Sequence, residues 1–383
     1  MEKRDVTMRT RILTLAGASW PARLWARNRC KTSNVKIRRS GSTVELRKEQ
    51  QSILLAPKHI FFASQVCDAF EAFAFALPAQ QREGINVFDF STNLEVFNAV
   101  RSCLIYGVTL ENHDGKIWIR KGSQVMILSG AHLVYARDMA EKFDLYFSPL
   151  VPEVRDGLQV LDYSTPGQLQ TYKSGLQFEM ASFPEEEEAI EEYFKWYRPK
   201  VGDLVFDVGA HCGVSTYHLA KLVGATGRVV AFEPDPVNYE ILRRNIERHG
   251  LTNVVAERAA IAGKAGKLGF NSEGSIGSSL QSLLQRKSVG SIVMVDAITL
   301  AEAFERWGTP AFCKIDIEGA EVDVIAASGD VLKKHPTHFA LDTNHPKANG
   351  EMTNGDVEGM FTSYGYEVLS EASPLWTTWA RPR

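Results

Sequence analysis

The sequence predicts an α/β protein whose C-terminal half forms a doubly wound, mostly parallel, seven-stranded sheet. Short apolar segments alternate with helical segments from residue 203 onward, and repeated β–α alternation gives a parallel sheet covered by helices on both faces. A turn containing glycines follows the first of these strands. The last two strands are joined by a short link, which predicts that this pair is antiparallel.

The alternation can be followed element by element. Strands are predicted at residues 203–208, 229–233, 253–256, 311–316, 338–341, 366–369 and 375–379. Helices are predicted at residues 214–223, 236–249, 320–325 and 357–363. Residues 266–295 interrupt the pattern, and their Gly/Ser-rich middle at 274–279 predicts a loop.

In the first half of the chain the predicted helices and strands do not alternate regularly, which predicts a separate N-terminal α+β extension. An apolar segment at 68–77 predicts a helix ended by Pro78, and 87–90 predicts a strand. The turn signal at 112–115 predicts a hairpin. Ser182 is expected to cap a helix with the acids 185–188 at its positive end.

The chain is therefore divided into three parts. These are a basic arm at 1–40, an α+β region of unknown role at 41–180, and a C-terminal α/β domain at 181–383. A short internal echo relates residues 87–92 to residues 160–165. Two strands that each end in a Ser-Thr turn would produce this echo through local turn chemistry, and we adopt that interpretation.

Composition excludes several classes of protein. Hydrophobic residues make up 44% and charged residues 23% of the chain, which is typical of a globular protein and excludes a disordered or collagen-like one. No stretch reaches the roughly 18 apolar residues that a membrane span needs. Five scattered cysteines favour free thiols in a reducing compartment, so we expect a cytoplasmic protein.

Charge is unevenly distributed along the chain. The net charge is −3 although Lys and Arg are concentrated in residues 1–40. We interpret that segment as a disordered, solvated arm. A basic arm for an acidic surface and a targeting segment are the alternatives. The remaining chain is acidic, so no overall positive field attracts nucleic acid.

The turn after the first strand carries the strongest chemical signal. Asp207 lies at the end of the strand, and Gly209 and Gly213 enclose a turn that includes Ala210. The middle glycine of a dinucleotide-binding fingerprint is missing. A carboxylate before the first glycine would repel a pyrophosphate but suits the cationic groups of S-adenosylmethionine. We expect Gly209 to let a ligand approach the backbone, and Gly213 to let the helix begin close to it.

Two further strand ends carry acids. Glu233 follows the second strand, where a carboxylate can accept both hydroxyls of a ribose. Asp316 and Glu318 lie in the segment KIDIEGAE at 314–321, where acids can orient a substrate or accept its proton. His345 follows the next strand and is a candidate base because its pKa is ordinarily near neutral.

In this order and context, residues 207–213, 232–234 and 314–321 resemble the FkbM family of S-adenosylmethionine-dependent methyltransferases. The resemblance covers about residues 180–370, and KIDIEGAE is its most specific part. It implies a class I, Rossmann-like methyltransferase fold. It also implies methyl transfer to a hydroxyl, often on a sugar or another natural-product scaffold.

Carried over by position, the resemblance implies specific site residues. The implied cofactor-binding residues are Asp207, Gly209, Ala210, Gly213, Glu233 and Asp316, with residues 257–260 near the adenine. The family commonly has asparagine where this chain has His211, so contacts of the first turn differ here. Asp316, Glu318 and His345 are the catalytic candidates.

A metal is the alternative to a base at this site. Asp316, Asp342 and Asn344 offer oxygen ligands for Mg²⁺ at two neighbouring strand ends. We expect no metal and favour base catalysis.

Three other functions remain open on the sequence alone. An NAD(P)-dependent oxidoreductase is disfavoured by the missing glycine. A nucleic-acid methyltransferase is also disfavoured. The enzymes of that class that act on exocyclic amines share an Asp/Asn-Pro-Pro-aromatic turn after the fourth strand, and no proline follows Asp316 here. A non-catalytic binding module could use residues 41–180. The expected partner is a small-molecule or glycan acceptor, with no nucleic acid and no membrane span, and a homo-oligomer is left open.

Overall fold

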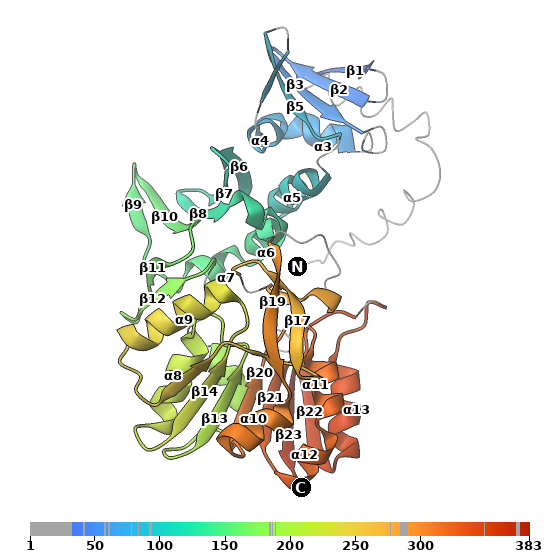
Figure 1. Cartoon of the computed structure of the whole chain (residues 1–383). Helices are drawn as coiled ribbons and strands as arrows, with labels where there is room; N and C mark the ends of the chain where they lie inside the picture. The colour runs from blue at the N-terminus through green and yellow to red at the C-terminus, as the bar shows by residue number, and fades with distance from the viewer. Residues whose placement is uncertain are drawn as a thin grey trace, which may run out of the picture. The chain divides into compact units, whose positions relative to one another are not determined.

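The structure is a computed structural model of the chain (Figure 1). It describes residues 33–40, 43–56, 59, 62–77, 79–82, 84–91, 94–183, 185, 187, 189–275, 277–283, 290–347, 349–372 and 376–383. The expected basic arm therefore lies mostly outside the described residues. Its last residues, Lys36–Ser40, form strand β1, so the expectation of a disordered arm is wrong for them.

The chain folds into two compact units. One comprises Met1–Val125 with Leu133–Glu141, and the other comprises Met126–His132 with Lys142–Arg383. We expected a functional boundary near residue 181, which stays a prediction. The compact unit that contains the C-terminal α/β elements takes in residues before that boundary.

The first unit begins with a five-stranded sheet in the order β1-β2-β3-β5-β4. Strands β3 and β5 are parallel, and the other pairs are antiparallel. The elements of this unit after β1 are β2 (Thr43–Lys48), β3 (Gln51–Leu55), α3 (Ala63–Asp68), α4 (Phe70–Phe75), β4 (Gln80–Arg82), β5 (Ile85–Asp89), α5 (Leu94–Ile105), β6 (Thr109–His113), β7 (Lys116–Lys121) and α6 (Ala136–Glu141). The predicted helix at 68–77 corresponds to α4.

The predicted hairpin around residues 112–115 is confirmed. Strands β6 and β7 pair antiparallel with His113 opposite Lys116. Asp114 and Gly115 both have positive φ, at 51° and 81°, as a tight two-residue turn requires. The Asn112 side chain accepts a hydrogen bond from the Gly115 backbone N–H at 3.3 Å.

A second five-stranded sheet repeats the topology of the first. Its order is β6-β7-β8-β10-β9, which matches β1-β2-β3-β5-β4 strand for strand. Its remaining strands are β8 (Gln124–Ser129), β9 (Glu153–Arg155) and β10 (Leu158–Tyr163). We had attributed the similarity between residues 87–92 and 160–165 to local turn chemistry alone. The structure shows that these residues lie at equivalent places in a repeated module.

Matching side chains support the repeat at a constant spacing along the chain. The Ser91 backbone N–H and hydroxyl both donate to Asp89, and those of Ser164 both donate to Asp162. The residues Arg82, Gly84 and Asp89 of the first copy correspond to Arg155, Gly157 and Asp162 of the second. In both copies the arginine pairs with the aspartate and the glycine has positive φ.

The second unit contains a seven-stranded sheet in the order β15-β14-β13-β20-β21-β23-β22. Its strands are β13 (Leu204–Val208), β14 (Arg228–Phe232), β15 (Val254–Glu257), β20 (Phe312–Ile315), β21 (His338–Asp342), β22 (Tyr366–Ala372) and β23 (Trp376–Pro382). The first five in sheet order are parallel. The predicted antiparallel arrangement of the last two strands is confirmed.

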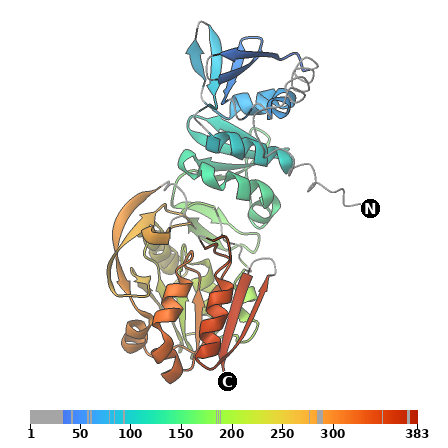
Figure 2. The same ribbon diagram turned by 90° about the vertical axis from the view of Figure 1, so that its right-hand side faces the viewer.

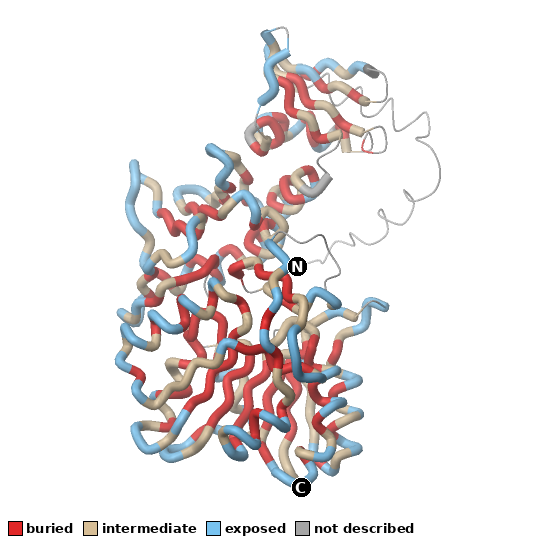
Figure 3. Tube along the Cα trace, in the orientation of Figure 1, coloured by how far each residue is buried: buried red, intermediate tan, exposed pale blue. Residues whose placement is uncertain are grey.

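Helices bury both faces of this sheet because alternate residues of a strand point to opposite sides. Phe206 and Phe232 pack in one apolar cluster with residues of α10 to α13, while Val205 and Val229 pack in another with residues of α8 and η3. The helices are α8 (Val214–Val223), α9 (Pro236–Arg248), α10 (Leu300–Trp307), α11 (Glu321–Ala327), α12 (Gly329–Lys334) and α13 (Asn354–Ser363). Figure 3 shows the central strands buried.

The interruption at 266–295 is more than a loop. Residues on either side of the Gly/Ser-rich segment form the long hairpin of β17 (Gly266–Ser272) and β19 (Ser291–Ile298), drawn in orange in Figure 2. With β16 (Ala260–Ile261) and β18 (Ser279–Leu280) it makes a separate four-stranded sheet. The remaining elements of the unit are α7 (Phe143–Phe147), β11 (Gln168–Thr171), β12 (Gln177–Met180), η3 (Ala189–Phe194) and η4 (Gln281–Leu283), and η2 (Gly130–Tyr135) is shared by the two units.

Two local predictions are wrong. Ser182 caps no helix in the described residues, since its hydroxyl is buried without a partner and the next helical turn, η3, begins at Ala189. Cys67 is disulfide-bonded, whereas we expected free thiols throughout. Three other cysteines are free and buried: Cys103, Cys212 and Cys313.

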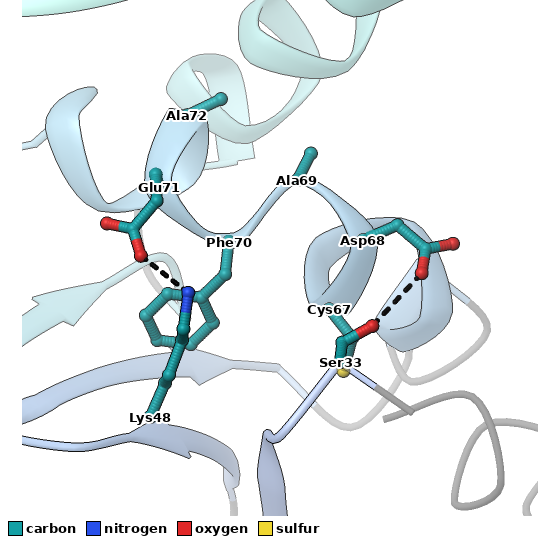
Figure 4. Close-up of a pocket in the computed structure, with 8 residues that line it drawn as sticks. All are labelled: Ser33, Lys48, Cys67, Asp68, Ala69, Phe70, Glu71 and Ala72. Carbon is teal, nitrogen blue, oxygen red and sulfur yellow. Dashed lines mark hydrogen bonds and ion pairs between the residues drawn. The ribbon is translucent and has the colours of Figure 1, made fainter. Parts of the chain in front are cut away.

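A pocket of about 280 Å³ lies in the first unit (Figure 4). Its rim carries two polar pairs, Lys48 with Glu71 at 2.8 Å and Ser33 with Asp68 at 3.2 Å. None of the predicted site residues lines it. Within the described part of the chain, no helix has both the length and the apolar character that crossing a membrane would require.

Candidate active site

The predicted site residues lie at one edge of the seven-stranded sheet because of strand register. Val208 is paired with Phe232 on one side and with Ile315 on the other, and Ile315 is paired with Leu341. The residues that follow these four positions are Gly209, Glu233, Asp316 and Asp342. Since the strands are parallel, these residues follow the carboxyl ends of adjacent strands, where ligands bind in open α/β sheets.

The first turn is held closely against the next strand. Gly209 has a φ of 81°, and a Cβ there would lie 1.8 Å from the backbone oxygen of Asp316. A Cβ on Gly213 would lie 2.6 Å from Leu242. We expected these glycines to make room for a ligand, but the structure shows that each first makes room for a neighbouring part of the protein.

Asp207 is buried beneath this turn. Its side chain is 0% exposed, accepts a hydrogen bond from Thr216 at 2.6 Å, and forms an ion pair with Lys314 at 3.3 Å. Lys314 also donates to the backbone oxygen of Gly209 at 3.2 Å. Although burial lowers the pKa of Lys314, the Asp207 and Asp316 carboxylates raise it above its usual value. The structure therefore gives Asp207 internal partners, and its predicted contact with a cofactor stays a prediction.

Glu233 is oriented by backbone donors. One carboxylate oxygen accepts from the His211 N–H at 2.8 Å, and the other accepts from the Asp235 N–H at 2.9 Å. Burial, together with the charge of Asp235, raises the pKa of Glu233 to about 7. A carboxylate oxygen has two lone pairs, so each oxygen retains capacity for a ligand hydroxyl.

Asp235 fixes the surroundings of Glu233. It caps α9 by accepting from the backbone N–H groups of Val237 and Asn238. Its second oxygen accepts from Gly274 N–H at 3.2 Å and from Ser278 at 2.7 Å. The loop between β17 and β18 is thus attached beside the second strand end. An acid before Pro236, at the first helical position, is a sequence signal that could have predicted the cap. No sequence signal could have predicted the attachment of this loop.

His345 lies between the acids of the KIDIEGAE segment. Its Nε2 is 3.9 Å from Asp316 and 3.8 Å from Glu318, and its Nδ1 is 3.0 Å from Glu321. Glu321 is fully buried and accepts from the backbone N–H groups of Ile317 and Gly319, both at 3.2 Å. The side chains of Asp316 and Glu318 are about a third exposed. A buried carboxylate therefore orients one side of the imidazole, while the other side faces acids that a ligand can reach.

The protonation of this cluster follows from its crowded charges. Burial and the nearby Asp316 and Asp342 carboxylates raise the pKa of Glu318 to about 8, against the opposing effect of His345. Burial and Asp316 likewise raise the pKa of Asp342 to about 6. Burial lowers the pKa of His345, but Glu321 and the other acids raise it well above its usual value. The cluster can hold and exchange a proton near neutral pH.

Comparisons with known proteins match the region that contains this site. A family model described as "Methyltransferase FkbM domain" matches residues 207–368. The chain carries an FkbM-family methyltransferase domain. The match begins at Asp207 and includes Glu233, Asp316 and His345, so the expected resemblance is confirmed for the region that contains the site.

Individual proteins similar to the chain are methyltransferases by name. The chain is 26% identical over 204 residues to the 31-O-demethyl-FK506 methyltransferase FkbM of Streptomyces tacrolimicus, covering 45% of this chain and 76% of that protein. Similar solved structures include methyltransferase FkbM from Methylobacillus flagellatus KT, at 12% identity and a TM-score of 0.37, covering 85% of this chain and 70% of that one. Another is precorrin-6y C5,15-methyltransferase from Geobacter metallireducens GS-15, at 13% identity and a TM-score of 0.35, covering 52% and 90%.

One contact of the candidate site comes from outside the matched residues. Glu185 Oε1 lies 2.5 Å from His211 Nδ1 in the turn at 209–213. From the sequence we expected the acids 185–188 at a helix start, which does not predict this pair. A charged residue opposite a histidine in a glycine turn gives no recognisable local signal, because the two positions are separated in sequence.

The candidate site also offers a set of possible metal ligands among the described residues. Asp316, Glu318 and His345 each present one ligand atom, and these atoms lie within 4.8 Å of one another. Two carboxylates and one imidazole suit a divalent cation in number and type. This set differs from the one considered on sequence, which combined Asp316 with Asp342 and Asn344. Our expectation that no metal is used stays a prediction.

Proposed function

We propose that this protein is an S-adenosylmethionine-dependent O-methyltransferase that acts on a hydroxyl of a sugar or natural-product-type acceptor. The observation that carries the proposal is the placement of Glu233, Asp316 and His345 at the carboxyl ends of three strands of an FkbM domain. The relative from Streptomyces tacrolimicus is named for O-methylation of such a product.

The donor set fits this cofactor. Glu233 would accept hydrogen bonds from the ribose hydroxyls, since its oxygens retain lone pairs beside two backbone donors. Asp316 would hold the cationic part from the end of β20, which lies two strands from β14 in the sheet. The turn containing Gly209, Ala210 and Gly213 would form the wall on the methionine side. The bound cofactor supplies a methyl group that is already activated for transfer.

The protein's own residues then supply orientation and a place for the acceptor's proton. A sugar hydroxyl is a poor nucleophile, so removing its proton speeds attack. Glu318 in its ionised form takes that proton and becomes neutral, and the positively charged His345 favours the ionised form of Glu318 before the transfer. Glu321 holds the imidazole in the orientation that this transfer needs. Alignment of the acceptor oxygen with the methyl group accelerates the transfer further.

Residues 41–180 are proposed to shape the acceptor site or an oligomer contact. The support is their position outside the matched domain, together with the repeated modules within them. An acceptor site built from such additions would explain how one domain serves different acceptors.

The function is tested with the full-length protein. Purified protein and S-adenosylmethionine carrying a labelled methyl group are added to an extract of cells that lack the gene. A metabolite heavier by one labelled methyl, with the label on oxygen, supports the proposal. Binding of NAD instead of S-adenosylmethionine in calorimetry would favour the oxidoreductase alternative, and label in RNA or DNA would favour a nucleic-acid acceptor.

A further inference from the structure

Glu185 comes from a chain segment that the family match does not include. It precedes the matched residues 207–368 and lies between β12 and η3. Its side chain is about one-fifth exposed, and its partner His211 is about one-tenth exposed. The 2.5 Å separation of Oε1 and Nδ1 is that of a short, charge-assisted hydrogen bond.

His211 connects this carboxylate to the cofactor side of the sheet. Its backbone has a φ of 48°, in the left-handed region that few residues other than glycine adopt. Its backbone N–H donates to Glu233 at 2.8 Å, and its second ring nitrogen lies 3.5 Å from the Cys212 sulfur. The imidazole ring therefore holds the turn at the point where its backbone contacts Glu233, the candidate ribose-binding residue.

The other acid near this turn already has partners. Asp207 is fully buried, with Thr216 and Lys314 on its oxygens. Glu185 thus differs from Asp207 in keeping part of its carboxylate exposed while contacting the turn directly.

We propose that Glu185 is a positioning residue of the cofactor site, which clamps His211 and thereby holds the turn at 209–213 against Glu233. This inference rests on the proposed binding of S-adenosylmethionine. It adds a residue from the N-terminal side of the chain to a site that otherwise lies within the FkbM domain.

The charges facing His211 give the clamp a measurable consequence. These groups are Glu185, the Cys212 thiol and Glu233. Burial lowers the pKa of His211, but Cys212 and Glu185 raise it well above its usual value. The resulting positive charge lowers the pKa of Glu233. Without Glu185, the pKa of His211 falls, so less positive charge faces Glu233 and the pKa of Glu233 rises.

The experiment compares Glu185→Gln with Glu187→Gln in the full-length protein. Glu187 belongs to the same acidic run but bonds to Ser174 at 2.7 Å instead. Affinity for S-adenosylmethionine is measured by calorimetry over a range of pH around neutrality. Glu185→Gln should weaken binding by about tenfold or more. Its binding curve should also move to higher pH, because Glu233 must be ionised to accept both hydroxyls. Glu187→Gln should match the wild type.

Unchanged affinity and an unchanged pH curve in Glu185→Gln would overturn the proposal. If that variant does not fold, the double variant Glu185→Gln/His211→Asn decides, since an amide pair can restore the hydrogen bond without charge. Its binding curve should lie at higher pH than that of the wild type, and a curve that coincides with the wild type would overturn the clamp. Absence of binding in the wild type would contradict the proposed function instead.

Discussion

Lys314 on β20 lies directly opposite Asp207 on the adjacent strand β13, with 3.3 Å between Nζ and Oδ1. Both side chains are almost fully buried. The same ammonium group donates to the backbone oxygen of Gly209. The two sequence motifs on these strands are therefore joined by one internal ion pair.

Removing the lysine should destabilise the fold. Lys314→Met leaves Asp207 buried without its partner, and breaking a buried pair from one side costs about 3–5 kcal/mol. Denaturant unfolding followed by tryptophan fluorescence measures the loss. Lys334→Met, at an exposed position of α12, should change stability by no more than about 0.5 kcal/mol. Equal effects of the two substitutions would contradict a structural role for the pair.

Replacement of Gly209 should destabilise the fold much more than replacement of Gly250, because only at Gly209 would a side chain meet another part of the protein. Both have positive φ, but a Cβ at Gly209 would meet the Asp316 backbone at 1.8 Å, whereas nothing lies within 4 Å of one at Gly250. Gly250→Ala should cost about 1 kcal/mol from backbone strain. Gly209→Ala should cost more than about 3 kcal/mol or prevent folding. Thermal unfolding of the two variants tests this, and comparable melting temperatures would rule out the close approach.

Cofactor affinity should depend on the ionisation of Glu233. Its pKa of about 7 means that the carboxyl becomes protonated as pH falls through neutrality, so one oxygen stops accepting. Affinity for S-adenosylmethionine should therefore fall as pH decreases below about 7, by up to about tenfold per pH unit. In Glu233→Gln binding should be weaker and this dependence absent. Glu240→Gln, on the exposed face of α9, is the matched control and should retain the wild-type curve in calorimetry.

Methyl transfer should depend on Glu318 and His345 without loss of cofactor binding. Glu318→Gln or His345→Asn should lower the single-turnover rate by about 10²–10⁴. The pKa of Glu318 is about 8, and a general base acts only when it is unprotonated. The wild-type rate should therefore rise with pH up to about 8. The rise should disappear in Glu318→Gln.

A chelator separates this mechanism from a metal-dependent one. If Asp316, Glu318 and His345 hold a cation, chelator should abolish turnover and Mg²⁺ should restore it. Base catalysis predicts no effect of chelator. Near-normal rates in both variants, with no chelator effect, would place the reaction centre elsewhere.

The parts of the site that follow strands could be predicted from the sequence. Asp207, Glu233 and Asp316 each stand at or just after the end of an apolar segment, and parallel strands bring such positions to one edge. Both strand and turn are set by nearby residues, so periodicity locates them. The structure confirms their common edge through the register of Val208 with Phe232 and Ile315.

Other features were missed because they depend on contacts between distant residues. Glu185 appeared to begin a helix but faces His211. Gly209 appeared to make room for a ligand but makes room for the Asp316 backbone. The echo at residues 87–92 appeared to be turn chemistry, but the strand order of two sheets shows a repeated module.

The order of strands and helices, the glycine turn, the acids at the strand ends and the FkbM resemblance could all be derived from the amino-acid sequence. These properties are local, because hydrophobic period and turn chemistry act over a few residues. The partners of those acids became known from the folded chain. Asp207 pairs internally with Lys314, while Glu321 orients His345. The energy of a buried charge depends on what surrounds it in space, and residues far apart in the chain supply those surroundings.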